Sequence, residues 1–148
     1  MNYIPADDRH PFKYYYDENA TGITANGKQY KGIVIAILEK DTWEVINKLE
    51  DMGVRVDWPG RPDLFMQPSF KGISYCSVDD EFDLKKGMRI AKLRALKKYY
   101  NNKCNILEAI GKTIMKENDK VEDMKGHAVY EFIETRYKLE KMEEGGKF

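Results

Sequence analysis

The fold is decided by residues 72–96, which read GISYCSVDDEFDLKKGMRIAKLRAL. The first part of this stretch is rich in residues that favour strands, whereas the part from Leu84 to about Tyr100 has apolar residues at helical spacing. Between the two parts, where the positive end of a helix dipole favours carboxylates, stand Asp79, Asp80, Glu81 and Asp83. The stretch therefore predicts a strand that leads, through an acidic helix start, into an amphipathic helix.

The N-terminal part of the chain predicts a β-hairpin. Asn26-Gly27 separates two strand-forming runs between Thr21 and Leu38, and Asn-Gly is the strongest two-residue hairpin signal because both positions need a positive φ. Residues 1–20 have no helical period and predict a loop that leads into an edge strand.

A short helix and two further strands are predicted after the hairpin. Asp41 and Glu44 have the spacing of a capping box, and apolar residues follow on one face until Gly53 ends the helix. Strand-forming residues at 54–58 and 64–77, interrupted by turn residues, predict two more strands that pair in the antiparallel sense.

The C-terminal third of the chain is predicted to be helical, over about 105–117 and 121–143. The last helix has an apolar seam at spacings near 3.5 residues, formed by Val121, Met124, Ala128, Phe132, Thr135, Leu139 and Met142. Such a seam predicts either a homodimer or packing of this helix against its own domain.

These elements predict an α+β fold in which two helices pack on a small antiparallel sheet, followed by a helical C-terminal extension. The 148 residues fit a single domain, and no internal repeat is visible. Within that domain, residues 1–100 are expected to form the α+β core and residues 101–148 the helical extension.

Composition indicates a folded protein without a dominant charge. The chain is 42% apolar and contains ten Tyr, six Phe and two Trp, too many aromatic residues for a disordered chain. Lys+Arg and Asp+Glu are each 25, so no global field attracts nucleic acid or a membrane.

The longest apolar run, residues 33–38, is too short to span a bilayer, and residues 1–5 lack the layout of a signal peptide. Cys76 and Cys104 match no disulfide or zinc pattern, so we expect reduced thiols and a cytoplasmic location.

The predicted helix that begins at Leu84 has the most informative charge pattern. Eight basic residues and no acid occur over residues 85–103, a local asymmetry in a chain of zero net charge. This pattern predicts a face that recognises phosphates or an acidic protein surface; the alternative is a solvated helix whose lysines pair with acids elsewhere. Phe82, beside the helix start, could contact an anionic ligand or could simply pack. The predicted binding residues are Phe82, Lys85, Arg89, Lys92, Arg94, Lys97 and Lys98.

The sequence contains no recognisable catalytic motif. His10 and His127 lie in the N-terminal loop and on a late helix, and neither is part of a nucleophile motif. A Gly-rich phosphate loop and a dinucleotide fingerprint are both missing from the sequence. The acids at 79–83 lack the spacing of a calcium loop and favour helix capping over metal binding. We therefore expect a binding protein with no catalytic residue, metal or cofactor.

Residues 72–96 also resemble a strand-to-helix motif of small phage and prophage accessory proteins. In that motif a strand ending in Cys or Ser runs into Asp-x-Phe-Asp, and then into Gly, Ile/Leu-Ala and Arg-Ala. The corresponding residues here are Cys76-Ser77, Asp80-Glu81-Phe82-Asp83, Gly87, Ile90-Ala91 and Arg94-Ala95. The resemblance implies a phage accessory protein, of a kind that often inhibits or sequesters components of host defence and has no agreed catalytic residues.

A looser likeness is to the double-stranded-RNA-binding domain, in which an α-β-β-β-α order ends in a Lys-rich helix that contacts phosphates. The predicted helix at Asp41, the strands after it and the basic helix at Leu84 imitate this order, but Lys85-Lys86 follows acids where that family has small residues. A nucleic-acid-binding module is therefore one alternative function. A metal-dependent nuclease or hydrolase that uses the acids at 79–83 is another.

Together these observations predict a phage-type accessory protein of the host-cell cytoplasm. Its expected partner is a host defence protein, which it would inhibit, or an anionic nucleotide signal, which it would sequester. The face formed by the basic residues from Lys85 to Lys98 is expected to carry recognition, and the protein is expected to form a homo-oligomer.

Overall fold

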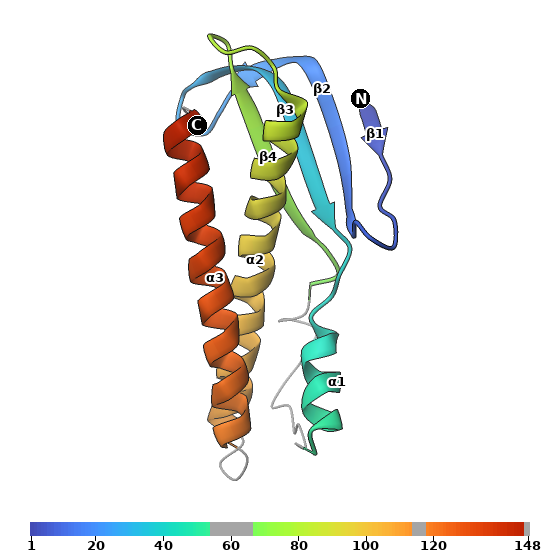
Figure 1. The fold of residues 1–148 in the computed structure, drawn as a ribbon, viewed down its shortest axis with the longest axis vertical. Helices are drawn as coiled ribbons and strands as arrows, with labels where there is room; N and C mark the ends of the chain where they lie inside the picture. The colour runs from blue at the N-terminus through green and yellow to red at the C-terminus, as the bar shows by residue number, and fades with distance from the viewer. Residues whose placement is uncertain (54–66, 114–117, 147–148) are drawn as a thin grey trace.

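The computed structural model describes residues 1–53, 67–113 and 118–146, which form a sheet with one long helix packed on it and a second long helix alongside the first (Figure 1). In chain order the elements are β1 (Asn2–Ile4), β2 (Phe12–Ile23), β3 (Gln29–Leu38), α1 (Trp43–Asp51), β4 (Phe70–Ser77), α2 (Leu84–Thr113) and α3 (Asn118–Gly146). The sheet is antiparallel with the strand order β1-β2-β3-β4. The protein is therefore α+β with a C-terminal helix, as its sequence predicts.

The predicted hairpin joins β2 to β3. Two backbone hydrogen bonds close its turn, from the Thr24 N–H to the Lys28 carbonyl at 2.8 Å and from the Gly27 N–H to the Thr24 carbonyl at 2.9 Å. β4 is the strand predicted within residues 64–77, and it pairs antiparallel to β3. The strand predicted at 54–58 lies outside the described residues.

The loop predicted for residues 1–20 is wrong at Asn2–Ile4, which form β1, and from Phe12 onward, where β2 begins and pairs with β1. Phe12 and Tyr14 are buried and Tyr16 packs against the same cluster, so alternate side chains of β2 face the core. The intervening Tyr15 faces the other side of the sheet. With tyrosine on both faces, the strand lacks the polar–apolar alternation by which strands are recognised in a sequence.

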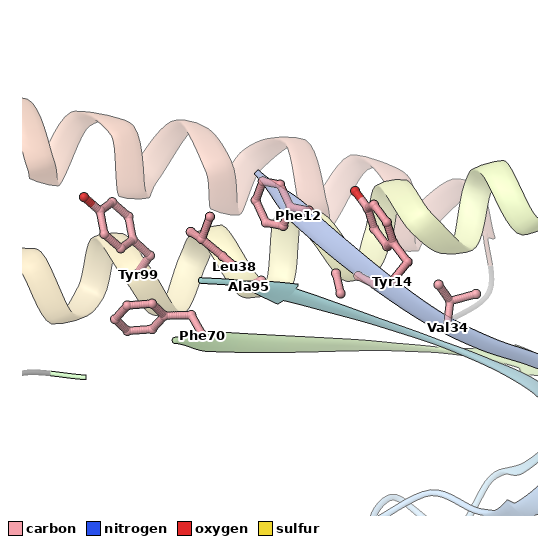
Figure 2. Packing of buried hydrophobic residues seen from close by; sticks show 9 residues of the cluster. Phe12, Tyr14, Val34, Leu38, Phe70, Ala95 and Tyr99 are labelled. Carbon is pink, nitrogen blue, oxygen red and sulfur yellow. The ribbon is translucent and has the colours of Figure 1, made fainter. Parts of the chain in front are cut away.

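Two buried clusters share α2. The first lies between the sheet and the N-terminal half of α2, as Figure 2 shows, and consists of Phe12, Tyr14, Val34, Ala36, Leu38, Phe70, Ala91, Ala95 and Tyr99. The second joins α1 to the C-terminal half of α2 and to α3, and consists of Val45, Ile46, Leu49, Ile106, Leu107, Ile110 and Ala128. One helix thus holds the sheet at one end and the helical cluster at the other (Figure 1).

α2 is one continuous helix, so the break predicted between Tyr100 and Asn105 is wrong. It has 30 residues, which corresponds to about 45 Å at 1.5 Å per residue. Asn101 and Asn102 have low helix propensity, but Ile106 and Leu107 just after them are fully buried. Packing of this next turn outweighs the weak local preference. Residue 100, where the helical extension was expected to begin, therefore lies inside a helix.

α3 lies alongside α2 of the same chain (Figure 1). The seam predicted on this helix faces inward: Ala128, Thr135 and Leu139 are buried, and Met124 packs against the second cluster. The spacing of the seam allowed either a homodimer or packing of the helix within its own domain, and in this structure the helix packs within the domain.

The predicted helix starts are confirmed in part. Asp83 caps α2, since its Oδ1 accepts the Lys86 backbone N–H at 3.1 Å. At α1, Asp41 Oδ1 accepts the Trp43 N–H at 3.1 Å, but Glu44 does not complete a capping box. Its carboxylate instead accepts a hydrogen bond from the hydroxyl of Tyr99, which ties α1 to α2, and it also pairs with Lys40 at 3.2 Å. Side-chain partners thus take the place of the backbone N–H that a capping box would use.

Candidate functional site

A groove of about 550 Å³ lies beside the β4 edge of the sheet, where α2 and α3 run past it. Among the strands that the structure describes, β4 pairs with β3 alone and so lies at the edge of the sheet. The groove is lined by Gly72, Ile73 and Tyr75 of β4, by Arg94, Lys97, Lys98 and Asn101 of α2, and by Phe132, Leu139 and Glu143 of α3. It combines three of the predicted binding residues with apolar side chains from two other elements.

Two of these cations are held by the backbone of the edge strand. Arg94 donates from Nη1 to the Ile73 carbonyl at 2.6 Å, and its Nη2 lies 3.2 Å from Glu143 Oε1. Lys98 donates from Nζ to the Lys71 carbonyl at 2.7 Å. Alternate residues of an edge strand point their carbonyls away from the sheet, so these two cations satisfy groups that none of the described strands reaches. Their charged heads are thereby fixed along one wall of the groove.

Lys97 is the third cation of the groove, and it is only partly exposed. Within residues 1–53, 67–113 and 118–146 its ammonium group forms no salt bridge. An incoming anion would supply this partly buried ammonium with a counterion.

The other three predicted cations lie apart from the groove. Lys85, Arg89 and Lys92 are exposed on a different flank of α2, and none of them lines the groove. Lys92 lies over the ring of Phe12, with Nζ 5.4 Å from the ring centroid, which places this flank beside β2. The six cations predicted as binding residues are therefore divided into two separate groups of three.

Phe82 packs into the fold. It contacts the sheet cluster and lies over the backbone of Gly32, where an added Cβ would come within 2.6 Å of the Phe82 ring. Gly32 has φ +110°, at an irregularity in the pairing of β3 with β4. Because a side chain at residue 32 would displace the ring, glycine is required there for this contact. From the sequence, Phe82 could either contact an anionic ligand or pack in the fold, and its contacts in the structure are packing contacts.

The acids that precede α2 form a turn. Cys76 lies beneath them, and its Sγ is 3.7 Å from the carbonyl oxygens of both Asp80 and Glu81. Burial, reinforced by the charge of Asp80, raises the pKa of the Cys76 thiol and so lowers its reactivity. In the part of the chain that the structure describes, no three His, Cys, Asp or Glu side chains gather as metal ligands.

The apolar wall of the groove could not be predicted from the sequence. Phe132 and Leu139 are seven residues apart on α3 and belong to the seam that was assigned to packing. A spacing of seven residues is expected both for side chains that pack in a core and for side chains that line a groove. The position of α3 relative to β4 decides between these roles, and that position depends on contacts between residues far apart in the sequence.

Comparisons with known proteins found no matching family model, curated protein or solved structure. Among the described helices, none is both long enough and apolar enough to cross a membrane.

Proposed function

We propose that this protein binds a phosphorylated nucleotide in the groove beside β4 and thereby sequesters it. The observation that supports this proposal is the convergence of Arg94, Lys97 and Lys98 on one groove that also has apolar walls. The sequestering role agrees with the phage-type accessory protein that the sequence resembles.

The chemistry of the groove suits both parts of such a ligand. Guanidinium and ammonium groups donate charge-assisted hydrogen bonds to phosphate oxygens. Phe132 and Leu139 offer an apolar surface to a base. A volume of about 550 Å³ is within the usual range for small-molecule sites.

Glu143 is the residue that opposes anion binding. Its carboxylate lies 3.2 Å from Arg94 and lines the same groove, so it occupies the guanidinium that a phosphate would need. A bound phosphate would take the place of this carboxylate. Removal of the Glu143 charge should therefore strengthen anion binding, whereas removal of a groove cation should weaken it.

Calorimetric titration with ADP and with cyclic di-AMP tests the proposal. Lys97→Glu should weaken binding by roughly tenfold or more, since a hydrogen bond to a charged group is worth about 1.5–3 kcal/mol, and Glu143→Gln should strengthen it. The matched control is Lys85→Glu, the same change on the same helix but outside the groove, and it should leave the affinity within about threefold.

The outcomes distinguish the other functions. Equal losses in Lys97→Glu and Lys85→Glu would contradict a groove site and indicate diffuse attraction by the whole basic helix. If neither nucleotide binds but a duplex does, with an affinity that falls steeply between about 50 and 200 mM salt, the nucleic-acid-binding alternative replaces the proposal. Hydrolysis of either nucleotide that requires a divalent metal would favour the enzyme alternative.

A further inference from the structure

The face of the sheet that points away from α2 carries a second feature. Its side chains belong to neither buried cluster, although many of them are large and apolar. The strand pairing places them in three rows across the sheet: Asp17, Ile33 and Tyr75; then Tyr3, Tyr15, Ile35 and Ile73; then Lys13, Ile37 and Lys71. We call this set of residues the open face.

The open face is more apolar than a solvated sheet surface. Isoleucine occupies its whole β3 column, at Ile33, Ile35 and Ile37, where sheets with one solvated face normally carry polar residues. Tyrosine rings contact one another at its margins, with Tyr3 and Tyr15 centroids 4.9 Å apart. A continuous apolar surface of this kind marks an interaction site.

The charges of the open face are arranged so that the face can match a second copy of itself. Asp17 stands in the first row, and Lys13 and Lys71 stand in the third, on opposite sides of the uncharged middle row. Within one subunit Lys13 pairs with Glu39, so the net positive charge of the third row comes from Lys71 and the negative charge of the first row from Asp17. A twofold axis along the middle row would therefore set a row of net negative charge against a row of net positive charge, with Asp17 placed at the Lys13–Glu39 pair of the second copy.

We infer that the open face is the interface of a symmetric homodimer. Rotation about the middle row stacks the two sheets face to face and sets the first row of one subunit against the third row of its partner. Asp17 then faces the partner's Lys13, and Tyr75 faces the partner's Lys71. Ile33 faces the partner's Ile37, and Ile35 meets the partner's Ile35 near the axis. The result is an eight-stranded sandwich with isoleucine at its centre.

A second copy is a better occupant than an unrelated protein for two reasons. The arrangement of the charges matches this chain's own surface, which a partner of different sequence would have no reason to reproduce. The seam of α3, the other surface from which the sequence predicts a dimer, is already filled by α2.

Sedimentation velocity over a range of protein concentrations tests the dimer. The wild type should sediment as a dimer at high concentration, and Ile35→Asp should be monomeric because it buries two uncompensated carboxylates at the axis. The control is Ile133→Asp on the outer face of α3, where Ile133 is 48% exposed, and it should leave dimerisation unchanged. Far-UV circular dichroism of each variant checks that the fold is retained.

A mixing experiment tests the predicted contact between Asp17 and the partner's Lys13. Asp17→Lys alone and Lys13→Asp alone each create two like-charge contacts per dimer, and each should weaken dimerisation roughly tenfold. An equimolar mixture should form a heterodimer of near wild-type affinity, because both contacts regain opposite charges. A monomeric wild type, a dimeric Ile35→Asp variant, or a mixture no stronger than its components would each overturn the inference. None of these outcomes depends on nucleotide binding.

Discussion

Tyr100 of α2 is coupled electrostatically to α3. Burial raises its pKa to about 12, and a hydrogen bond with Glu131 of α3 acts in the same direction. Both effects stabilise the neutral phenol, because an ionised Tyr100 would be desolvated beside a carboxylate. The folded protein therefore holds this proton more tightly than the unfolded chain does.

The stability of the protein should fall in alkaline solution for this reason. Since the folded pKa of about 12 lies above the unfolded value of 10.0, the contribution of Tyr100 is fully present below pH 10 and is lost as the pH rises towards 12. Tyr100→Phe should show a smaller loss of unfolding free energy between pH 9 and 11 than the wild type, by urea denaturation. Tyr137→Phe, at an exposed position, should match the wild type. An equal alkaline loss in all three proteins would contradict the assignment.

The cations that line the groove illustrate what a sequence can reveal at this scale. The density of basic residues on one helix drew attention to Arg94, Lys97 and Lys98 as part of a larger predicted set. It could not separate them from Lys85 and its neighbours, because the flank that faces β4 depends on how α2 rotates against the sheet. That rotation is set by the core residues of two other elements, which the charge pattern does not contain.

At the scale of elements, β4 and α2 approach each other closely at Gly72. An ideal Cβ on this residue would lie 2.0 Å from the Ala91 carbonyl oxygen and 2.5 Å from the Ala95 backbone nitrogen. Both obstacles are backbone atoms of α2, so no side chain can rotate away to relieve the clash. Contact between strand and helix thus depends on the absence of a side chain at this one position.

Gly72→Ala should strongly destabilise the protein. The helix must move away from the strand, which opens the sheet cluster and should cost at least 2 or 3 kcal/mol, within the range of about 1–3 or more for overpacked cores. Urea denaturation measures the change. Gly126→Ala is the matched control: Gly126 lies in α3 with open space around it, and alanine should stabilise the helix there by roughly 1 kcal/mol. Two changes of the same sign would contradict this account.

Most elements could be predicted from local signals, and the errors share one cause. Asn26-Gly27 and Asp83 act through neighbours in the chain, and both predictions are confirmed. The strand at Phe12 and the continuity of α2 past Asn102 depend on contacts with distant residues. Local preference is weak in both places, so tertiary packing decides the outcome.

For the whole molecule, the decisive feature is that both buried clusters use the same helix. A clash, cavity or strain at one end of α2 is transmitted along a rigid element to the other end. The sheet and the helical cluster should therefore unfold together. This coupling was not predictable, because the sequence divides near residue 100 into parts with separate hydrophobic patterns.

Leu107→Ala tests the coupling. Leu107 is fully buried in the helical cluster, and its truncation should lower the unfolding free energy by about 2–5 kcal/mol in a single transition. At fixed protein concentration, mass-spectrometric hydrogen exchange should also show faster exchange of the β3 amides, although β3 belongs to the other cluster. Ile133→Ala, on the exposed face of α3, should change neither quantity by much. Two separate transitions, or unchanged exchange in β3, would show that the clusters are independent.

The hydrogen bonds from Arg94 and Lys98 to the Ile73 and Lys71 carbonyls have a consequence for solubility. A bare edge strand is a template on which further strands can polymerise, and proteins commonly guard such edges with charged side chains. In this protein the charged side chains that protect the edge are Arg94 and Lys98, which are also the cations that the groove would offer to an anion. A ligand that drew both of them away from β4 would leave the edge open. The protein would then be most prone to aggregation at the moment its groove is filled.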